Sequence, residues 1–256
     1  REKLVRKGDV DVMVSVGNNF FYTLSLPCSL WFFDRNKHAD IRDKVLFIDA
    51  RNYYTVVDRT LNEWTEWQLR NLQAIVHLYR GEKEKYLSLI RDYVEILDNV
   101  FAPLAPERLE EVIKNGEKEY STRFAACLEH EKKQAKEAIA AAKRKEKKQV
   151  EAEWKETIEH WEDLLETARQ FEWLTEKFGD GEYKDVLGLC KIATIREIEE
   201  KNYSLTPGAY VGVAEQEDDG VDFHERMTEI HAELAQLNKK ANVLMDEIQK
   251  AWEELK

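Results

Sequence analysis

The N-terminal part of the chain consists of short apolar runs separated by polar turns, a pattern typical of β-strands. Residues 9–16 alternate polar and apolar side chains and are rich in valine, whereas residues 28–33 and 44–50 are apolar nearly throughout. These runs predict three strands, and we expect the apolar ones to be buried. The short polar connection at residues 36–43 predicts that the last two strands pair as an antiparallel hairpin.

Beyond residue 60 the spacing of apolar residues becomes helical. Residues 65–79 and 85–101 carry amphipathic patterns, and Pro103 and Pro106 then interrupt the chain. Residues 107–177 predict helix nearly throughout, with two apolar stripes that favour a long helical hairpin. The basic cluster at residues 143–148 contains an interleaved glutamate and has no aromatic neighbours. It therefore predicts a solvated helix face rather than a DNA-binding site.

A regular apolar seam marks the last forty or so residues, because its positions alternate steps of four and three. The seam consists of Phe223, Met227, Ile230, Leu234, Leu237, Ala241, Leu244, Ile248, Ala251 and Leu255. This pattern predicts a coiled-coil helix, and the acidic residues 215–220 before it predict a linker. Two interpretations remain, a helix that docks on a partner, which we favour, and a helix packed on its own domain.

Composition limits the classes of function. The chain has 256 residues, with 39 Lys and Arg against 51 Asp and Glu, and a formal net charge of -12. This balance argues against DNA binding by the chain alone, although the first eighty or so residues are nearly neutral and we expect any DNA contact there. No apolar run is long enough to span a membrane and no signal peptide opens the chain, so we expect a cytoplasmic protein without a membrane partner.

Cysteine and histidine spacing gives no sign of a metal site. Cys28, Cys127 and Cys190 are too far apart for a CxxC motif, and an odd number does not suit a disulfide framework. The histidines show no ligand spacing with cysteines or carboxylates. We therefore expect reduced thiols and no bound metal.

Two separated segments resemble a known family. Residues 18–23 (NNFFYT), 26–34 (LPCSLWFFD) and 45–52 (VLFIDARN) resemble the modification (M) subunit of type I restriction-modification systems. Residues 190–198 (CKIATIREI), 203–208 (YSLTPG) and 210–212 (YVG) are similar to the C-terminal signature of the same family, while residues 117–177 show no detailed match. Members of this family are site-specific DNA methyltransferases that move a methyl group from S-adenosylmethionine to N6 of adenine.

The resemblance implies an enzyme, but this sequence lacks two motifs that the chemistry needs. A glycine-rich strand-to-helix turn for the cofactor is absent, since the Gly-x-Gly at residues 179–181 follows a helical pattern. An Asn/Asp-Pro-Pro-Phe/Tyr loop is absent too, because no two of the four prolines are adjacent. The chain also opens at Arg1 within a helical run. We therefore expect a C-terminal fragment that has no catalytic or cofactor-binding residues and is inactive alone, with S-adenosylmethionine bound by the full-length subunit.

The resemblance also suggests roles for the loop at residues 17–22. Enzymes that modify a base flip it out of the duplex and hold it by stacking on aromatic side chains. Phe21 is the residue we expect to stack, with Tyr22 next, and the alternative is that these aromatics cap the sheet as ordinary core residues. Asn18 and Asn19 either contact the nucleotide or supply the turn, and the turn is favoured.

The expected fold is the last strands of a class I methyltransferase sheet, followed by a mainly helical region with a long hairpin and a coiled-coil helix. We expect four regions: the end of the catalytic domain (1–60), a helical region (61–178), a connecting segment (179–214), and the linker with the last helix (215–256). Expected partners are the specificity (S) subunit through that helix, the restriction (R) subunit, a second M subunit and double-stranded DNA. The alternative is a non-enzymatic helical assembly protein with a small α/β docking domain.

Overall fold

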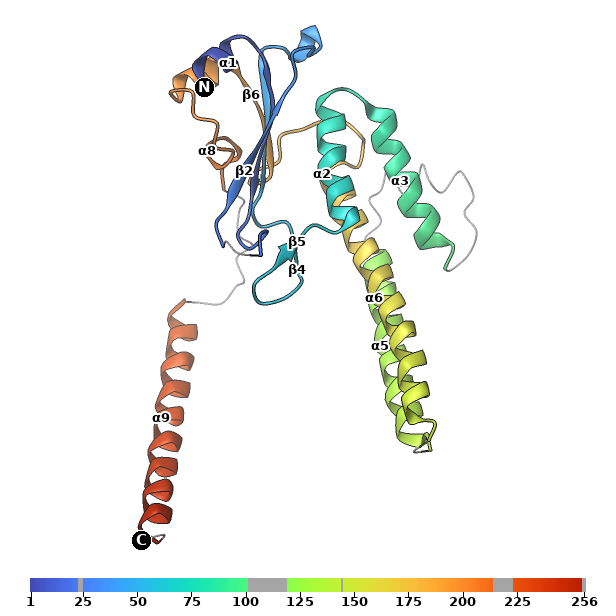
Figure 1. Cartoon of the computed structure of the whole chain (residues 1–256), viewed down its shortest axis with the longest axis vertical. Coiled ribbons are helices and arrows are strands. Elements are labelled where there is room, and N and C mark those ends of the chain that lie inside the picture. Colours follow the sequence, from blue (N-terminus) through green and yellow to red (C-terminus); the bar gives the residue numbers. More distant parts are fainter. Residues whose placement is uncertain (23–24, 101–118, 144, 214–222, 255–256) are drawn as a thin grey trace. The chain divides into compact units, whose positions relative to one another are not determined.

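The computed structural model describes residues 1–22, 25–100, 119–143, 145–213 and 223–254. The chain divides into two units, Arg1–Ala214 and Glu215–Lys256. The first unit contains a mixed four-stranded sheet with helices on both faces (Figure 1). The second contains one long helix, α9 (Phe223–Glu254). The expected combination of an α/β part with a large helical part is therefore present.

Three strands form at the predicted positions, and a fourth comes from far along the chain. They are β1 (Val10–Val16), β2 (Cys28–Phe33), β3 (Lys44–Ala50) and β6 (Cys190–Thr194). Their order across the sheet is β2-β1-β3-β6. β1 and β3 run parallel, with Val14 opposite Ile48, while β2 and β6 run antiparallel to their neighbours.

The predicted antiparallel hairpin between residues 28–33 and 44–50 is wrong. β1 lies between these two strands, so β2 pairs with β1 and does not pair with β3. The connection between them contains a short 3-10 helix, Ala39–Ile41, and is held by the buried Lys37. The Lys37 ammonium donates hydrogen bonds to the carbonyl of Val10 at 2.9 Å and to that of Lys44. The connection therefore crosses the end of β1. The short polar stretch at residues 36–43 does not show this, because a connection of the same length could also form a hairpin.

The expectation of a buried second strand is also wrong. β1 is buried throughout, and Val45 to Ile48 of β3 are at most 2% exposed. In β2, by contrast, Leu30, Trp31, Phe32 and Phe33 are 38% to 50% exposed. β2 is an edge strand, and the helices that cover the rest of the sheet leave its side chains accessible.

The opposite edge, β6, was not predicted as a strand. Its five residues include Lys191 and Thr194, and only Cys190 and Ala193 are fully buried, so the apolar pattern is weak. β6 is followed directly by α7 (Ile195–Glu200), which starts with a capping box between Thr194 and Glu197. The segment at residues 179–214 therefore contributes to the sheet as well as connecting to the last helix.

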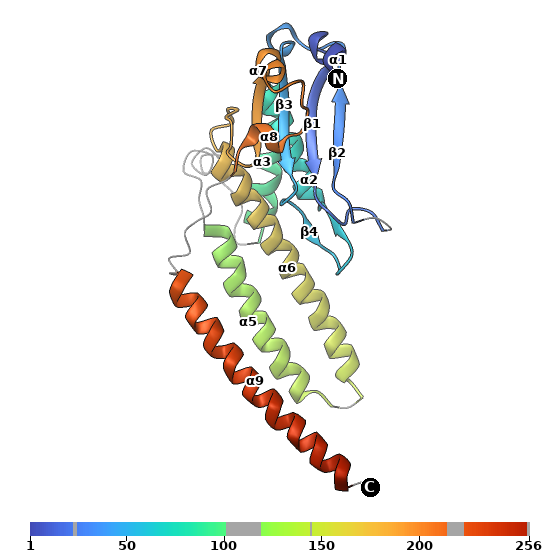
Figure 2. The same ribbon diagram turned by 90° about the vertical axis from the view of Figure 1, so that its left-hand side faces the viewer.

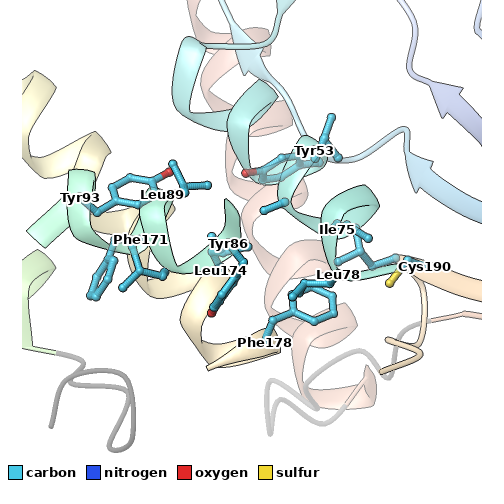
Figure 3. Close-up of a cluster of buried hydrophobic side chains, with 14 of the residues drawn as sticks. Tyr53, Ile75, Leu78, Tyr86, Leu89, Tyr93, Phe171, Leu174, Phe178 and Cys190 are labelled. Carbon is cyan, nitrogen blue, oxygen red and sulfur yellow. The ribbon is translucent and has the colours of Figure 1, made fainter. Parts of the chain in front are cut away.

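Each face of the sheet carries its own apolar layer. On one face, α1 (Glu2–Arg6), α7 and α8 (Gly208–Val211) cover Met13 and Phe47. The rings of Phe47 and Tyr210 stack with centroids 3.9 Å apart. On the other face, α2 (Glu66–Tyr79), α3 (Lys83–Asp98) and the end of α6 (Lys147–Phe178) form a larger core of aromatic and aliphatic side chains (Figure 3).

The predicted helical hairpin is present. α5 (Glu119–Ala141) and α6 (Lys147–Phe178) lie side by side, with Phe124 and Trp161 in ring contact at 6.0 Å and Lys132 paired to Glu162 at 2.9 Å. The expected helix face at residues 143–148 is wrong in part, because Lys143, Lys145 and Glu146 lie between the two helices and only Lys147 and Lys148 belong to α6. Arg144 lies outside the described residues. The predicted start of this helical region, residues 107–118, also lies outside them.

A buried polar network joins the elements that support the ends of β1 and β3. The Asn71 amide donates to the hydroxyl of Tyr53 and to the carbonyl of Gln170, both at 3.0 Å, and accepts from the Tyr93 hydroxyl at 2.9 Å. Burial raises the pKa of Tyr53 and of Tyr93, so both stay neutral donors. The network fixes Tyr53, which follows β3, against α2, α3 and α6.

Candidate functional site

The segments that follow β1 and β3 lie at the same end of the sheet, where both strands have their carboxyl termini. Because these strands are parallel, their carboxyl ends point the same way, and this is where open α/β sheets place ligands. The loop after β1 begins at Gly17, and the segment after β3 leads into a small hairpin of β4 (Thr55–Val56) and β5 (Asn62–Glu63). Figure 2 shows β4 at this end of the sheet.

The loop after β1 turns sharply at Asn19, which has a φ of 61°. Asparagine tolerates this left-handed conformation better than most residues. The backbone N–H of Asn62 donates to the Asn19 carbonyl at 2.7 Å, and the Asn62 side-chain amide donates to the Asn18 carbonyl at 2.9 Å. The turn interpretation of Asn18 and Asn19 therefore has a structural basis in the backbone of both residues.

Phe20 is the aromatic of this loop that packs against the protein. Its ring lies 4.9 Å from that of Trp64 and meets the Tyr54 ring edge-on at 6.0 Å. Trp64 is fixed in turn, because its indole N–H donates to the carbonyl of Tyr53 at 2.6 Å. Phe20 is thus partly buried and in contact with neighbouring rings.

The next two aromatics are exposed. Phe21 is 49% exposed and Tyr22 is 89% exposed, although both are large apolar or amphipathic side chains. The structure brings the predicted residues Asn18, Asn19, Phe21 and Tyr22 together on one turn. Phe20 anchors this turn, and the two following rings remain accessible to a ligand.

The two segments that carry the family resemblance meet where Gly208 packs against Asp49 and Arg51. Arg51 donates to the Asp49 carboxylate through Nε at 2.8 Å and Nη2 at 2.6 Å. Gly208 lies against this pair, since a Cβ there would come within 2.8 Å of Arg51 Nη2 and 3.3 Å of Asp49 Oδ2. Gly17 is equally confined, because its Cβ would lie 2.6 Å from the Arg51 carbonyl oxygen. Asp49 and Arg51 thus link both segments in a structural role.

Sequence reasoning did not single out Tyr54, Asn62 and Trp64, which hold the loop. None of them belongs to a recognisable motif, and a two-residue strand such as β5 gives no periodic signal. Only the tertiary fold shows that residues near position 62 meet residues near position 18. The exposed valines of the β4–β5 hairpin, Val56 and Val57, likewise have no sequence signature.

The described part of the chain holds neither a metal-binding cluster nor a membrane-spanning helix. No group of three or more His, Cys, Asp or Glu side chains is arranged there to hold a metal ion. Nor is any of the described helices both long and apolar enough to cross a membrane.

The unit at residues 215–256 presents the predicted seam on α9. The described seam positions with large side chains, Met227, Ile230, Leu234, Leu237 and Leu244, are all exposed. The side chains of Phe223, Ile248 and Leu255 lie outside the described residues. At about 1.5 Å per residue, a helix of 32 residues extends for roughly 48 Å, so the seam is long enough for a substantial partner surface.

Comparison with known proteins finds relatives of one kind. The HindI methylase subunit of a type I restriction enzyme from Haemophilus influenzae is 25% identical over 250 residues, which cover 98% of this chain and 34% of that protein. The MjaIX methylase subunit of a type I restriction enzyme from Methanocaldococcus jannaschii is 24% identical over 256 residues, 100% of this chain and 28% of that protein. The chain thus spans about a third of the length of these curated relatives.

A solved structure and a family model complete the comparison. The crystal structure of a type I restriction-modification methyltransferase subunit from Streptococcus thermophilus matches 83% of this chain and 22% of that chain, at 13% identity and a TM-score of 0.32. The family model described as N-6 DNA Methylase matches residues 1–133 and 120–219. These ranges include both the loop after β1 and the segment around Gly208, and they show that the chain belongs to the N-6 DNA methylase family.

Proposed function

We propose that this chain forms one part of the M subunit of a type I restriction-modification system, which methylates N6 of adenine in DNA using S-adenosylmethionine. The observation that carries the proposal is the family match over residues 1–219, supported by two curated relatives that are both named methylase subunits of type I restriction enzymes. In this proposal the chain supplies the target-base loop and helices for assembly. The chemistry is completed by the longer subunit.

S-adenosylmethionine does not fit the strand ends of this chain. A cofactor turn needs open space where glycine lets the backbone approach the ligand. At Gly17 that space holds the Arg51 carbonyl, and at Gly208 it holds the Arg51 guanidinium and the Asp49 carboxylate. We therefore place the cofactor site in the part of the subunit that lies beyond this chain. Calorimetry should detect no cofactor binding to the chain alone, and stoichiometric binding would contradict this placement.

Phe21 and Tyr22 are the residues proposed to stack on the flipped adenine. Their exposure at the carboxyl end of β1 supports this role, because a base can reach both rings without displacing core side chains. Asn18 has an exposed side chain and is a proposed nucleotide contact. Asn19 contributes chiefly the turn, since its carbonyl is bound to Asn62 and its φ is 61°.

The test of this role uses Phe21→Ala and Phe21→Tyr in the complete methyltransferase. Base stacking on an aromatic side chain contributes about 1 to 3 kcal/mol, so Phe21→Ala should lower kcat/KM for adenine methylation by about 5- to 150-fold. Phe21→Tyr keeps a ring of the same size and should retain most of the activity. Loss of thermal stability in Phe21→Ala with unchanged methylation would show that Phe21 is a packing residue.

We further propose that the exposed edge at β2 receives the remaining strands of the methyltransferase sheet. Leu30 and Phe32 line an apolar groove of about 560 Å³ between the sheet and α2, while their neighbours Trp31 and Phe33 are exposed as well. A soluble protein rarely leaves a long apolar edge strand uncovered. An additional strand with flanking helices would bury these side chains and pair the free backbone groups of β2.

The α9 seam is proposed to bind the S subunit, in an assembly that also includes the R subunit, a second M subunit and double-stranded DNA. The exposed Leu237 and Leu244 support this, since burying one leucine side chain is worth about 1.5 to 3 kcal/mol. The double variant Leu237→Glu with Leu244→Glu should keep its melting profile alone but no longer co-purify with the S subunit. The control, Gln236→Glu with Asn238→Glu, adds the same charge at polar positions and should still bind. Early melting with retained binding would assign the seam to an internal core.

A further inference from the structure

Asn62 makes two hydrogen bonds to consecutive carbonyls of the loop after β1. Its backbone N–H donates to the carbonyl of Asn19 at 2.7 Å, and its side-chain amide donates to the carbonyl of Asn18 at 2.9 Å. The residue is only 7% exposed, so water competes weakly for these bonds. A carboxylate at position 62 could not donate to Asn18, and an aliphatic side chain could make no side-chain bond.

These bonds fix the part of the loop whose backbone is least usual. Asn19 has a φ of 61°, in the left-handed region, and both of its flanking contacts restrain it. On one side its carbonyl is bound, and on the other Phe20 packs against Trp64 at 4.9 Å. Because Asn18 to Phe20 are held in this way, the fold restricts the backbone at Phe21 and therefore the direction of its side chain.

The hairpin that carries Asn62 is itself anchored to a helix. The hydroxyl of Thr55 in β4 donates to Gln68 Oε1 at 3.3 Å, and Gln68 forms the capping box of α2 with Thr65. The turn of the hairpin is closed by Asp58, which accepts bonds from the backbone N–H of Thr60 at 2.6 Å and from its hydroxyl at 2.9 Å. Asn62 therefore connects the loop after β1 to a hairpin that is itself held against α2.

We propose that Asn62 is a positioning residue that holds the loop at residues 18–20 in the conformation that presents Phe21 to a flipped base. The inference rests on the proposed methyltransferase function and assigns a role to the β4–β5 hairpin. Asn62 acts through Phe21 and makes no contact with the DNA in this account. Its removal should affect capture of the extruded base and not the reading of the DNA sequence.

The test compares Asn62→Asp with Asn52→Asp in the complete methyltransferase. Asn62→Asp is nearly isosteric and removes the donor to Asn18, whereas Asn52 is exposed and undergoes the same change in charge nearby. Loss of one buried hydrogen bond should lower kcat for methylation by about tenfold or more, with KM for DNA changed less. Fluorescence of 2-aminopurine at the target position should fall in parallel. Asn52→Asp should behave as wild type.

Two further measurements separate positioning from a general loss of stability. A mismatched target adenine costs less to extrude, so it should reduce the defect of Asn62→Asp, whereas an unstable protein would be impaired equally on both substrates. The double variant with Phe21→Ala should be no worse than Phe21→Ala alone, because Asn62 acts through that ring. Asn62→Ala removes the donor without adding a charge, and it replaces Asn62→Asp if the latter fails to fold.

The outcomes distinguish the two proposals. If Phe21→Ala impairs methylation while both Asn62 variants match wild type, or if the two defects are additive, the positioning role is overturned and the target-base loop stands. If Phe21→Ala has no effect on methylation or on 2-aminopurine fluorescence, the target-base loop itself fails, and the role of Asn62 fails with it.

Discussion

β2 and β3 have similarly apolar sequences, but one is exposed and the other is buried. Both strands are near neighbours, with β2 paired to one side of β1 and β3 to the other. Phe47 of β3 is fully buried and stacks on Tyr210, whereas Phe33 of β2 is 50% exposed and contacts Trp31 at 6.2 Å. The difference lies in the helices, which cover β3 on both faces and end before β2.

This comparison shows that pairing into a sheet does not by itself bury a strand. Backbone hydrogen bonds hold β2 on β1, but apolar side chains are removed from water only by a second layer. An apolar sequence such as residues 28–33 predicts the environment that a strand requires. At β2 this environment is incomplete within the described residues, and that is the basis for proposing that more of the sheet adds there.

The largest expected effect is the loss of stability when a phenylalanine of β3 is replaced, compared with the same replacement in β2. Phe47→Ala should lower the free energy of unfolding by about 3 to 5 kcal/mol, because it leaves a cavity between the sheet and α8. Phe33→Ala should lower it by less than about 1 kcal/mol, since half of the ring is already in water. Denaturation of the isolated chain measures both values. Equal losses would mean that β2 is packed as well as β3.

The sequence predicted the elements better than their arrangement. Periodicity located β1, β2, β3, α2, α3 and the α5–α6 hairpin, because each has enough residues to show its repeat. It misplaced the β2–β3 pairing, since nothing in residues 36–43 reveals that Lys37 bridges Val10 and Lys44 across the end of β1.

The candidate site was predictable only in part, for the same reason. The family resemblance pointed to Phe21 and Tyr22 and left open whether loop aromatics pack inward. The structure assigns the inward position to Phe20, which depends on Trp64 and Tyr54. Such contacts join residues more than thirty positions apart and leave no local pattern in the sequence.

The two sheet edges should also differ in thiol reactivity, an effect of intermediate size. Burial raises the pKa of Cys190 in β6 to about 11, so at pH 8 this thiol is protonated as well as inaccessible. Cys28 in β2 is partly exposed. Iodoacetamide at pH 8 should therefore alkylate Cys28 at least about tenfold faster than Cys190. The contrary result is that both cysteines are alkylated at equal rates in the folded chain and that denaturant does not raise either rate. It would show that the β6 edge is as open as the β2 edge.

The smallest expected effect concerns the capping box that closes the β6 edge. A hydrogen bond from the backbone N–H of Thr194 lowers the pKa of the Glu197 carboxyl below its ordinary value of 4.5. A carboxylate with a lowered pKa stabilises the fold above the unfolded value, and this contribution is lost as the pH falls through the folded value. Thr194→Ala should cost about 1 kcal/mol near pH 7.

The matching experiment follows Glu197→Gln between pH 7 and pH 3. Its stability difference from wild type should shrink as the pH falls below 4.5, because the wild-type side chain then becomes neutral too. A difference that stays constant with pH would indicate that Glu197 contributes as a neutral hydrogen-bonding group.

The central claim is that the rest of a methyltransferase sheet pairs with β2. Hydrogen exchange of β2 tests this claim most directly. Amides of residues 28–33 are compared between the isolated chain and the complete longer subunit, with β3 as the internal reference. We predict that β2 exchange slows by about tenfold or more in the longer subunit while β3 stays unchanged. Equally fast exchange of β2 in both proteins would contradict the account, because the strand would then remain an exposed edge.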